Sequence, residues 1–323
     1  MTIKKTEKLQ LIIFFALLLF ASVLIINGGY FSAVKRGLSV WLVAILPTVF
    51  PYVFITASLS KLEITGKITA SAGKVTKTLF NTGGATAFAL FISVISGYPL
   101  GAKTVAELKK GGLLTKTESE RASTFCSTSS PVYMITGVGT IALKNRLFGW
   151  ALFLSNVISA IIVGIVFRFY KKQDKPSPIK PSCSKCDNVF YESVFSSVTS
   201  TLVLCGTTVL FTVVTEILLS FGLLSFPIKI GYCLLKDYGL SKGVIFGFFE
   251  CSLGIREITK IGLTFWTLPL CGLLCGFGGI SSMLSSVGFL KSAKIKTAPF
   301  LFAKILHAVV NFLICLCFNL LFI

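Results

Sequence analysis

The stretch SVISGYPLGAKTVAELKKGG, residues 93–112, interrupts an apolar segment of this chain with four glycines, one proline and three lysines. Pro99 removes a backbone donor and Gly97 is conformationally permissive, so we expect a helix to break at this point. In lipid, a break leaves backbone N–H and C=O groups without partners and persists only where protein or a watery cavity covers it. The stretch therefore predicts a site rather than a plain membrane span.

The composition of the whole chain indicates a membrane protein. Of its 323 residues, 54% are hydrophobic and 13% are charged, whereas soluble domains carry about 25% charged residues. Apolar runs of about 20 residues, long enough to cross a bilayer, recur along the chain. We predict an all-α, polytopic protein of the cell membrane. Its predicted spans are residues 9–28, 37–60, 122–142, 147–170, 193–220, 265–290 and 299–323, with shorter glycine-broken pieces at 83–101 and 243–256.

The net charge of +19 fits a membrane protein better than a nucleic-acid-binding protein. The 31 lysines and arginines are scattered among short loops, with no basic domain to hold them. The positive-inside rule and anionic headgroups explain this distribution, so we predict the lipid bilayer, and no nucleic acid, as a partner. The same rule places the N-terminus and the proline- and lysine-rich linker 171–192 in the cytoplasm.

The sequence indicates no enzyme. Most of its ten cysteines lie in apolar stretches, where cysteine behaves as a small packing residue. Cys183 and Cys186 form a CxxC pair in a polar loop, but a structural zinc site needs two more ligands at regular spacing. The single histidine, His307, forms neither a metal site nor a triad, and no nucleotide-binding or protease motif occurs. We expect no catalytic residue, no metal and no cofactor.

Two blocks of the sequence repeat in the same order. Leu100-Gly-Ala-Lys103 follows the first short apolar piece, and Leu253-Gly-Ile-Arg256 follows the second. Each block precedes a glycine- or serine-rich apolar segment, at 126–139 and 275–288. Paired broken helices of this kind are typical of secondary transporters with inverted repeats. We predict four regions: an N-terminal transmembrane helix with a short loop at 1–36, a first repeat at 37–170, the linker at 171–192 and a second repeat at 193–323.

Loop charges predict how the two short pieces enter the membrane. Lysines on both sides of residues 83–101 place both ends of that piece in the cytoplasm, so it is a re-entrant hairpin or broken helix. Residues 243–256 then enter from outside. Five cations of the second half oppose this topology because it leaves them external or buried: Lys229, Lys236, Lys242, Arg256 and Lys260.

The predicted breaks carry the candidate binding residues. The start of each continuing half-helix presents free N–H groups and a positive dipole, which suit an electron-rich group. Glu250 lies in an apolar stretch, where an unpaired carboxylate costs about 3 kcal/mol, so we expect it to be paired, protonated or bound to a ligand. The predicted substrate-binding residues are Ser96, Gly97, Tyr98, Pro99, Gly101, Lys103, Ser127, Thr128, Ser129, Glu250, Ser252, Gly254, Gly278 and Gly279.

Several of these polar residues have a structural alternative. Lys103 either faces a site or extends to the headgroups. The hydroxyl cluster at 127–130 either lines a site or bonds back to carbonyls of its own helix. Arg256 and Glu257 suit an interfacial ion pair. Lys304 and His307 are one helical turn apart, and we expect them to share a polar contact at the cytoplasmic end of the last span.

Three blocks carry a resemblance to a known family. SGYPLGAKTVAELKKGGLLTKTESERASTFC at 96–126, FFECSLGI at 248–255, and GFGGIS at 276–281 with the later KILH at 304–307 resemble the sporulation integral membrane proteins of the YlbJ/SpoVV kind. That family lies within the larger group with a nucleoside-recognition, or Gate, domain. The resemblance runs from about Trp41 to about Phe318. This chain has Ser127-Thr128 where the family has Asn-Asn, and Met283-Leu284-Ser285 where it has His-Ala-Gln.

The resemblance implies a role in spore formation, with movement of dipicolinic acid across a membrane around the forespore. Dipicolinate is a small aromatic dianion, which suits helix N-termini and Lys103. We therefore predict a transporter that moves a small polar, anionic solute by alternating access. The alternatives are a transporter of nucleosides or other organic anions, and a non-transporting membrane scaffold or maturation factor. A coupling ion and an oligomer are both compatible with this interpretation.

Overall fold

Helices and turns make up the part of the chain that the structure describes. The computed structural model describes residues 28–60, 64–171 and 188–322, with scattered residues between 14 and 25, and these ranges contain no strand. The predicted all-α class is confirmed. The predicted span 9–28 lies largely outside the described residues, as do residues 172–187 of the predicted linker, which include Cys183 and Cys186.

The first half contains five parts in order. They are a long helical segment (α2–η1–α3), a helix at one end of the molecule (α4), a hairpin (α5–α6), a broken span (α7–η2) and a long span (α8). The elements are α2 (Tyr30–Val40), η1 (Trp41–Ile45), α3 (Leu46–Ser60), α4 (Ile64–Phe80), α5 (Ala85–Ser96), α6 (Leu100–Lys110), α7 (Lys116–Phe125), η2 (Val132–Ala142) and α8 (Arg146–Phe167). The segments η1 and η2 are π-helical. Both lie beside prolines, which cannot donate the usual backbone hydrogen bond.

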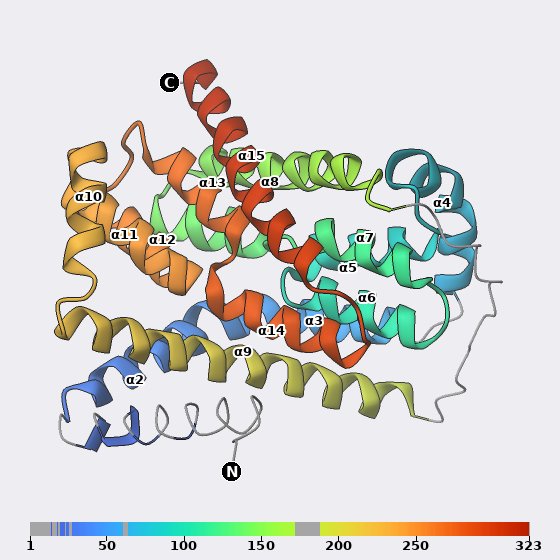
Figure 1. The fold of residues 1–323 in the computed structure, drawn as a ribbon, viewed down its shortest axis with the longest axis horizontal. Helices are drawn as coiled ribbons and strands as arrows, with labels where there is room; N and C mark the ends of the chain where they lie inside the picture. The colour runs from blue at the N-terminus through green and yellow to red at the C-terminus, as the bar shows by residue number, and fades with distance from the viewer. Residues whose placement is uncertain are drawn as a thin grey trace, which may run out of the picture.

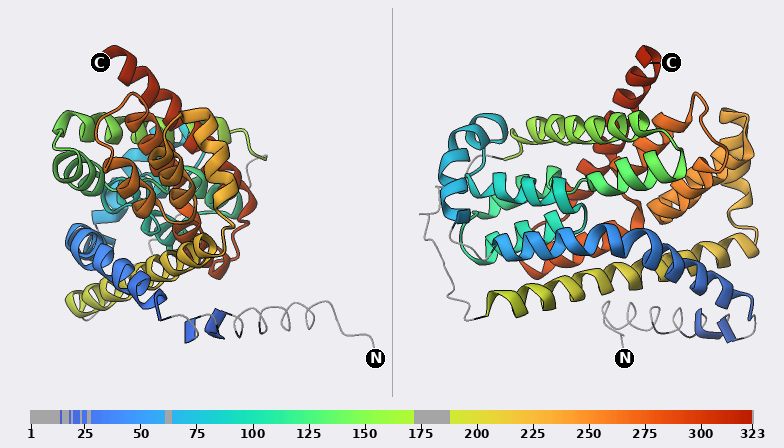
Figure 2. Two further views of the ribbon diagram at one scale, coloured as in Figure 1. Left: turned by 90° about the vertical axis from the view of Figure 1, so that its left-hand side faces the viewer. Right: turned by 180° about the vertical axis from the view of Figure 1, so that it is seen from behind.

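The second half repeats this order of elements. They are α9 (Val189–Ser220), α10 (Ser225–Leu235), α11 (Tyr238–Phe249), α12 (Cys251–Thr259), α13 (Thr267–Phe277), α14 (Gly279–Ser292) and α15 (Ala298–Phe322). Helix α9 corresponds to α2–α3, and the two pack side by side (Figure 2). The hairpin α11–α12 corresponds to α5–α6, and the broken span α13–α14 to α7–η2.

The two halves run in opposite directions. Figure 1 shows α4 at one end of the molecule and α10 at the other, both lying across the long helices. The hairpin α5–α6 lies toward the α4 end and α11–α12 toward the α10 end, so their tips approach each other in the middle. This is the arrangement expected from two broken segments of opposite orientation. The repeat boundaries at 37–170 and 193–323 stay predictions.

Local sequence signals explain where several helices begin. Asn145, Asn188 and Asp237 each accept a hydrogen bond from a backbone N–H of the first turn of α8, α9 or α11. Thr115 and Glu118 form a reciprocal capping box at the start of α7. These short polar side chains are the preferred caps because they satisfy donors that a helix start leaves free.

Several helices are long and apolar enough to cross a membrane. Among the described residues they are α8, α9, the combined segment Thr267–Ser292, and α15, which match the predicted spans 147–170, 193–220, 265–290 and 299–323. The predicted piece 83–101 forms α5 and the tip that follows, and α5 is bent by 83° from the end of α4. At about 1.5 Å per residue, α9 is about 48 Å long, which exceeds the hydrocarbon core.

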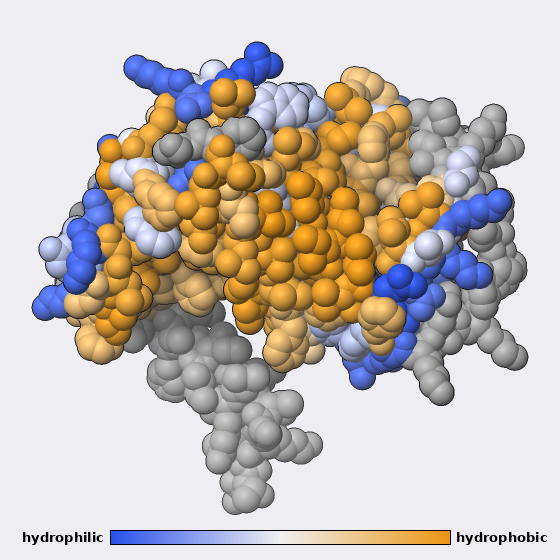
Figure 3. All heavy atoms as spheres, turned by 90° about the horizontal axis from the view of Figure 1, so that it is seen from above, coloured by the Kyte–Doolittle hydropathy of each residue, from blue (hydrophilic) through white to orange (hydrophobic). Residues whose placement is uncertain are grey.

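The surface of these spans is apolar where a soluble protein would be polar. Helix α8 exposes large hydrophobic side chains at helical spacing along one face and buries Ser155, Asn156 and Ser159 on the other. Figure 3 shows a broad hydrophobic band across the middle of one face, with hydrophilic side chains gathered toward its two ends. Apolar surface on this scale requires a lipid environment. The protein is a multi-pass membrane protein, as predicted.

A buried arginine ties several elements together near α4. The guanidinium of Arg121 on α7 donates to the backbone oxygens of Asn81, at 2.6 Å, Tyr170, at 3.0 Å, and Lys171, at 2.5 Å. Lys171 also forms an ion pair with the buried Glu120. The folded chain buries Arg121 because three carbonyls meet its planar donor group.

Candidate functional site

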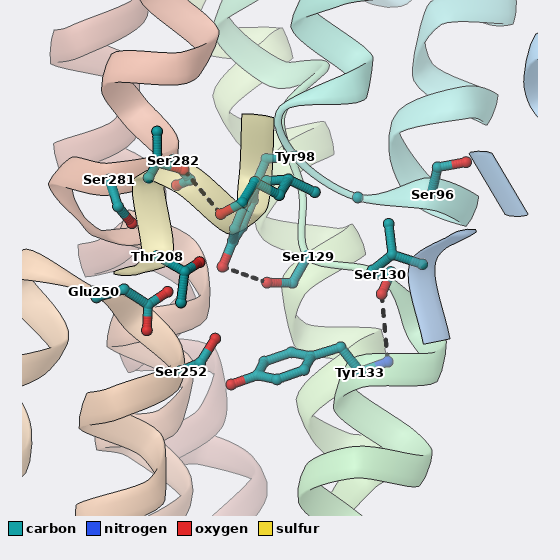
Figure 4. A pocket seen from close by; sticks show the side chains of 14 residues that line it. Ser96, Tyr98, Ser129, Ser130, Tyr133, Thr208, Glu250, Ser252, Ser281 and Ser282 are labelled. Atoms are coloured by element: carbon teal, nitrogen blue, oxygen red, sulfur yellow. Dashed lines mark hydrogen bonds between the residues drawn. The ribbon is translucent and has the colours of Figure 1, made fainter. Parts of the chain in front are cut away.

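The four helix breaks surround one cavity. It measures about 60 Å³, enough for a few water molecules or a small polar group. Most of its lining side chains carry hydroxyls, and Figure 4 shows them converging from both halves of the chain. The lining residues are Val49, Ser96, Gly97, Tyr98, Ser129, Ser130, Tyr133, Leu204, Thr207, Thr208, Glu250, Ser252, Ser281 and Ser282.

The first hairpin tip is formed by Gly97, Tyr98 and Pro99. Helix α5 ends because Gly97 adopts φ +82°, a conformation that other residues rarely adopt. An added Cβ at Gly97 would lie 2.9 Å from the backbone nitrogen of Ser130, so glycine also permits a close approach. The backbone N–H of Tyr98 donates to the carbonyl of Thr128 at 2.7 Å. The tip is therefore fixed to the unwound segment that separates α7 from η2.

That unwound segment, residues 126–131, is held by hydroxyl contacts. The hydroxyl of Thr128 donates to the carbonyl of Ser93 at 2.8 Å, and its N–H donates to the Ser93 hydroxyl at 3.0 Å. The Ser129 hydroxyl donates to the Tyr98 oxygen at 2.9 Å, as Figure 4 shows. The cluster thus joins α5 and the first tip to the unwound segment, and Ser129 and Ser130 line the cavity itself.

The second hairpin tip is a single residue, Glu250. Its backbone is extended, with φ −143° and ψ 115°, between α11 and α12. One carboxylate oxygen accepts the N–H of Leu253 at 2.8 Å, which caps α12. The residue is 5% exposed and lines the cavity, and in Figure 4 its carboxylate lies on the side of Thr208 and Ser252. Glu250 is thus bound to its own helix and also faces the cavity.

Two glycines form the last break, between α13 and α14. Gly278 and Gly279 have φ of +85° and +77°, in the left-handed region. An added Cβ at Gly279 would lie 2.8 Å from the backbone nitrogen of Cys251, and one at Gly278 would lie 3.3 Å from the ring of Tyr98. Bulkier residues here would push both hairpin tips away, so this break brings the two halves into contact.

Three half-helices begin at the cavity, and two of them, α6 and α14, have no side-chain cap at their N-cap residues Pro99 and Gly278. At the start of η2, the Ser130 hydroxyl accepts the backbone N–H of Tyr133 at 3.3 Å (Figure 4). Such helix starts carry a positive partial charge and free N–H groups. The cavity therefore combines one carboxylate, many hydroxyls, two tyrosine rings and three positive helix ends.

The predicted binding residues divide into two groups. Ser96, Gly97, Tyr98, Ser129, Glu250 and Ser252 line the cavity. The others do not line it: Pro99, Gly101, Lys103, Ser127, Thr128, Gly254, Gly278 and Gly279. A binding role for either group stays a prediction.

Among the second group, Gly101 and Gly254 permit close packing within the hairpins. An added Cβ at Gly101 would lie 2.3 Å from the carbonyl oxygen of Cys126, and one at Gly254 would lie 2.3 Å from the Cα of Gly247. Lys103 instead donates to the hydroxyls of Ser196, at 2.7 Å, and Ser200, at 3.0 Å. It neither lines the cavity nor depends on the headgroups for a polar partner.

Sequence reasoning missed the contribution of α9. Thr207, Thr208 and Leu204 line the cavity, and the buried face of α9 carries Ser193, Ser197, Ser200, Thr201, Thr208, Thr212 and Thr215. Hydroxyls at helical spacing along an otherwise apolar span are the signal that marks this face. Tyr133, Ser281 and Ser282 were also missed, whereas Ser130 belongs to the hydroxyl cluster that the sequence offered as a site lining.

Two predicted polar contacts differ in the structure. Lys304 and His307 do not share a partner: the Lys304 ammonium donates to the Ser127 carbonyl at 2.9 Å, and His307 Nε2 lies 3.2 Å from the Asn156 carbonyl. Both side chains are buried because α15 packs between α7, α8 and α13. Glu257 pairs with Lys242, at 3.4 Å, and with Lys260 rather than with Arg256, because those ammonium groups lie nearer to it.

Comparison with known proteins identifies one relative. The Bacillus subtilis (strain 168) protein named sporulation integral membrane protein YlbJ is 24% identical to this chain, over 96% of this chain and 82% of its own length. No protein-family model and no solved structure matches the chain. The wider nucleoside-recognition grouping therefore stays an expectation. The chain is, as its motifs predicted, a multi-pass membrane protein related to the sporulation integral membrane protein YlbJ.

Proposed function

We propose that this protein transports a small polar solute across a membrane during spore formation. The observation that carries the proposal is the meeting of two oppositely directed hairpin tips and two broken spans around one hydroxyl-rich cavity. Secondary transporters with inverted repeats bind their solutes at such a meeting point. The relative's printed name supports the link to sporulation.

The cost of the breaks argues against a purely structural role. Each break interrupts the backbone hydrogen bonding of a helix within a membrane protein, where every group left unsatisfied costs several kcal/mol. A scaffold would need only continuous helices and small residues for packing. The convergence of four such breaks on one cavity therefore supports a ligand-binding role.

Dipicolinate is the solute we favour. Its two carboxylates suit the uncapped starts of α6 and α14, and its aromatic ring suits the tyrosine rings of the cavity wall. The sporulation relative adds support, since the family resemblance implies this solute.

A nucleoside is the second candidate, and a specific observation favours it. The described residues that line the cavity include the carboxylate of Glu250 but no lysine or arginine. A carboxylate repels a dianion, whereas it accepts hydrogen bonds from sugar hydroxyls or base amino groups. The charge of Glu250 therefore discriminates between the two solutes.

The test is uptake by proteoliposomes that contain the purified full chain. Labelled dipicolinate and labelled uridine are supplied to the wild type, to Glu250→Gln and to Glu192→Gln, a matched control at the exposed start of α9. If dipicolinate is the solute, removing the negative charge strengthens its binding by about tenfold. If a nucleoside is the solute, the same change weakens binding by about tenfold, because a charge-assisted acceptor is lost.

The control should match the wild type in both assays. If neither dipicolinate nor uridine is transported, and cells that carry Glu250→Gln form spores normally, the result would support the scaffold role and overturn the transport proposal.

A further inference from the structure

The end of α7 is an electronegative point inside the protein. This helix stops at Phe125, and residues 127–130 have no helical structure before η2 begins. A helix C-terminus leaves carbonyls unpaired and carries a negative partial charge. In transporters with broken helices, such ends and the unwound carbonyls beside them hold the coupling cation.

The ammonium of Lys304 lies at this point. It extends from α15 and donates to the carbonyl of Ser127, two residues past the end of α7, at 2.9 Å. It also lies 5.2 Å from the centre of the Tyr98 ring, so it contacts the hairpin tip as well as the unwound segment. One side chain thus joins three separate elements.

The environment of Lys304 replaces water with polar groups but supplies no opposite formal charge. The side chain is 1% exposed, and no described carboxylate forms an ion pair with it. The titratable groups that face it are Tyr98, the thiols of Cys251 and Cys275, and His307 on its own helix. Burial disfavours the charged ammonium, and a carbonyl, an aromatic face and a helix end offset part of that cost.

We propose that Lys304 is a tethered cation that occupies the place of a coupling ion at the broken end of α7. Lys304 is a positioning residue, because it holds the first hairpin tip against the unwound segment. The proposal rests on the transport function argued above. Because the cation belongs to the chain, solute movement needs no sodium.

Removal of the side chain should leave a site for an external cation. Lys304→Ala would expose the Ser127 carbonyl together with the Ser127 hydroxyl, which is buried without a hydrogen-bond partner among the described residues. A small cation that enters the space would regain the carbonyl and the Tyr98 ring. The variant should therefore respond to cations that leave the wild type unaffected.

The experiment measures uptake of the labelled solutes named above by proteoliposomes in choline, sodium or ethylammonium chloride. It compares the wild type, Lys304→Ala, Lys304→Gln and the exposed control Lys291→Ala. We expect wild-type and control flux to be equal in the three salts. Lys304→Ala should be at least about tenfold slower in choline and should recover severalfold in ethylammonium or sodium. Lys304→Gln keeps most of the side-chain volume without the charge, so it should stay slow in every salt.

A melting curve in detergent gives an answer that does not depend on flux. Lys304→Ala should melt about 3 °C higher in ethylammonium than in choline, because a ligand that binds the native state stabilises it. The wild type should melt at the same temperature in both salts. If no variant moves any solute but this shift occurs, the transport proposal fails and the cation site stands. Sodium-dependent wild-type flux, or a folded Lys304→Ala that ignores all cations in both assays, overturns the inference.

If Lys304→Ala does not fold, Lys304→Gln still decides the question. Flux of Lys304→Gln equal to that of the wild type in choline would show that the charge is not needed, and a slow but folded Lys304→Gln would support the proposal.

Discussion

The two hairpins, α5–α6 and α11–α12, have the same architecture and different tips. The first turns through three residues and presents the phenol of Tyr98 to the cavity, while the second turns at Glu250 alone and presents a carboxylate. The first tip is held by a backbone bond to Thr128, and the second by the bond from its own side chain to α12. The pair therefore offers one aromatic and one acidic surface to a ligand.

Their shared sequence features serve the backbone. The glycine of Leu-Gly-Ala-Lys and the glycine of Leu-Gly-Ile-Arg both lie where a hairpin arm touches another backbone. The cations that end the two blocks differ in role: Lys103 donates to two hydroxyls of α9, whereas Arg256 is exposed and lines a second pocket together with Glu216 and Glu257. The common pattern thus encodes the hairpin, and the positions that differ give each tip its chemistry.

The largest effects should come from the shared glycines. Gly101→Ala and Gly254→Ala each place a methyl group about 2.3 Å from a backbone atom, and overpacking of this kind costs about 1–3 kcal/mol. We expect both variants to lower the melting temperature in detergent. Gly206→Ala and Gly288→Ala, on helices with no atom within 4 Å of the added methyl, are the matched controls and should be neutral or slightly stabilising. If only one of the two hairpin glycines is sensitive, their roles are not equivalent.

The sequence predicts the breaks well because their causes are local. Gly97, Pro99 and Gly278 act through backbone conformation, which a short stretch encodes by itself. The burial of Glu250 can also be predicted from a short stretch, since a carboxylate within an apolar run must find a partner. These signals identified six of the residues that line the cavity.

The contributions of α9 and α15 could not be predicted in the same way. Hydroxyls such as Thr208 bond equally well to their own helix or to a ligand, and only packing decides which face of α9 is buried. Lys304 lies close in sequence to the lysines at 291–296, which suggests the cytoplasmic surface. Its burial depends on α15 packing against α7, a contact between residues far apart in the chain.

A smaller effect should distinguish the two tips. Glu250→Ala removes the cap of α12 and should lower stability by about 1 kcal/mol, whereas Tyr98→Phe removes no helix cap and loses the acceptor for the Ser129 hydroxyl. Melting temperatures of both variants in detergent test this order. The double variant Tyr98→Phe with Ser129→Ala checks that the loss at the first tip belongs to this bond, because it should cost less than the sum of the single changes. A Tyr98→Phe variant less stable than Glu250→Ala would reverse the proposed difference between the tips.

The smallest effect should separate the two cations that end the repeated blocks. Lys103→Ala removes hydrogen bonds to Ser196 and Ser200 and should cost about 1 kcal/mol, because it loosens the contact between α6 and α9. Arg256 is exposed, so Arg256→Ala should change stability by less than about 0.5 kcal/mol. Melting temperatures of the two variants at equal salt provide the measurement, and Ser200→Ala should reproduce part of the Lys103 effect. Equal losses at both positions would mean that the repeat preserves the role of the cation as well as that of the glycine. The difference between the halves would then be confined to the hairpin tips.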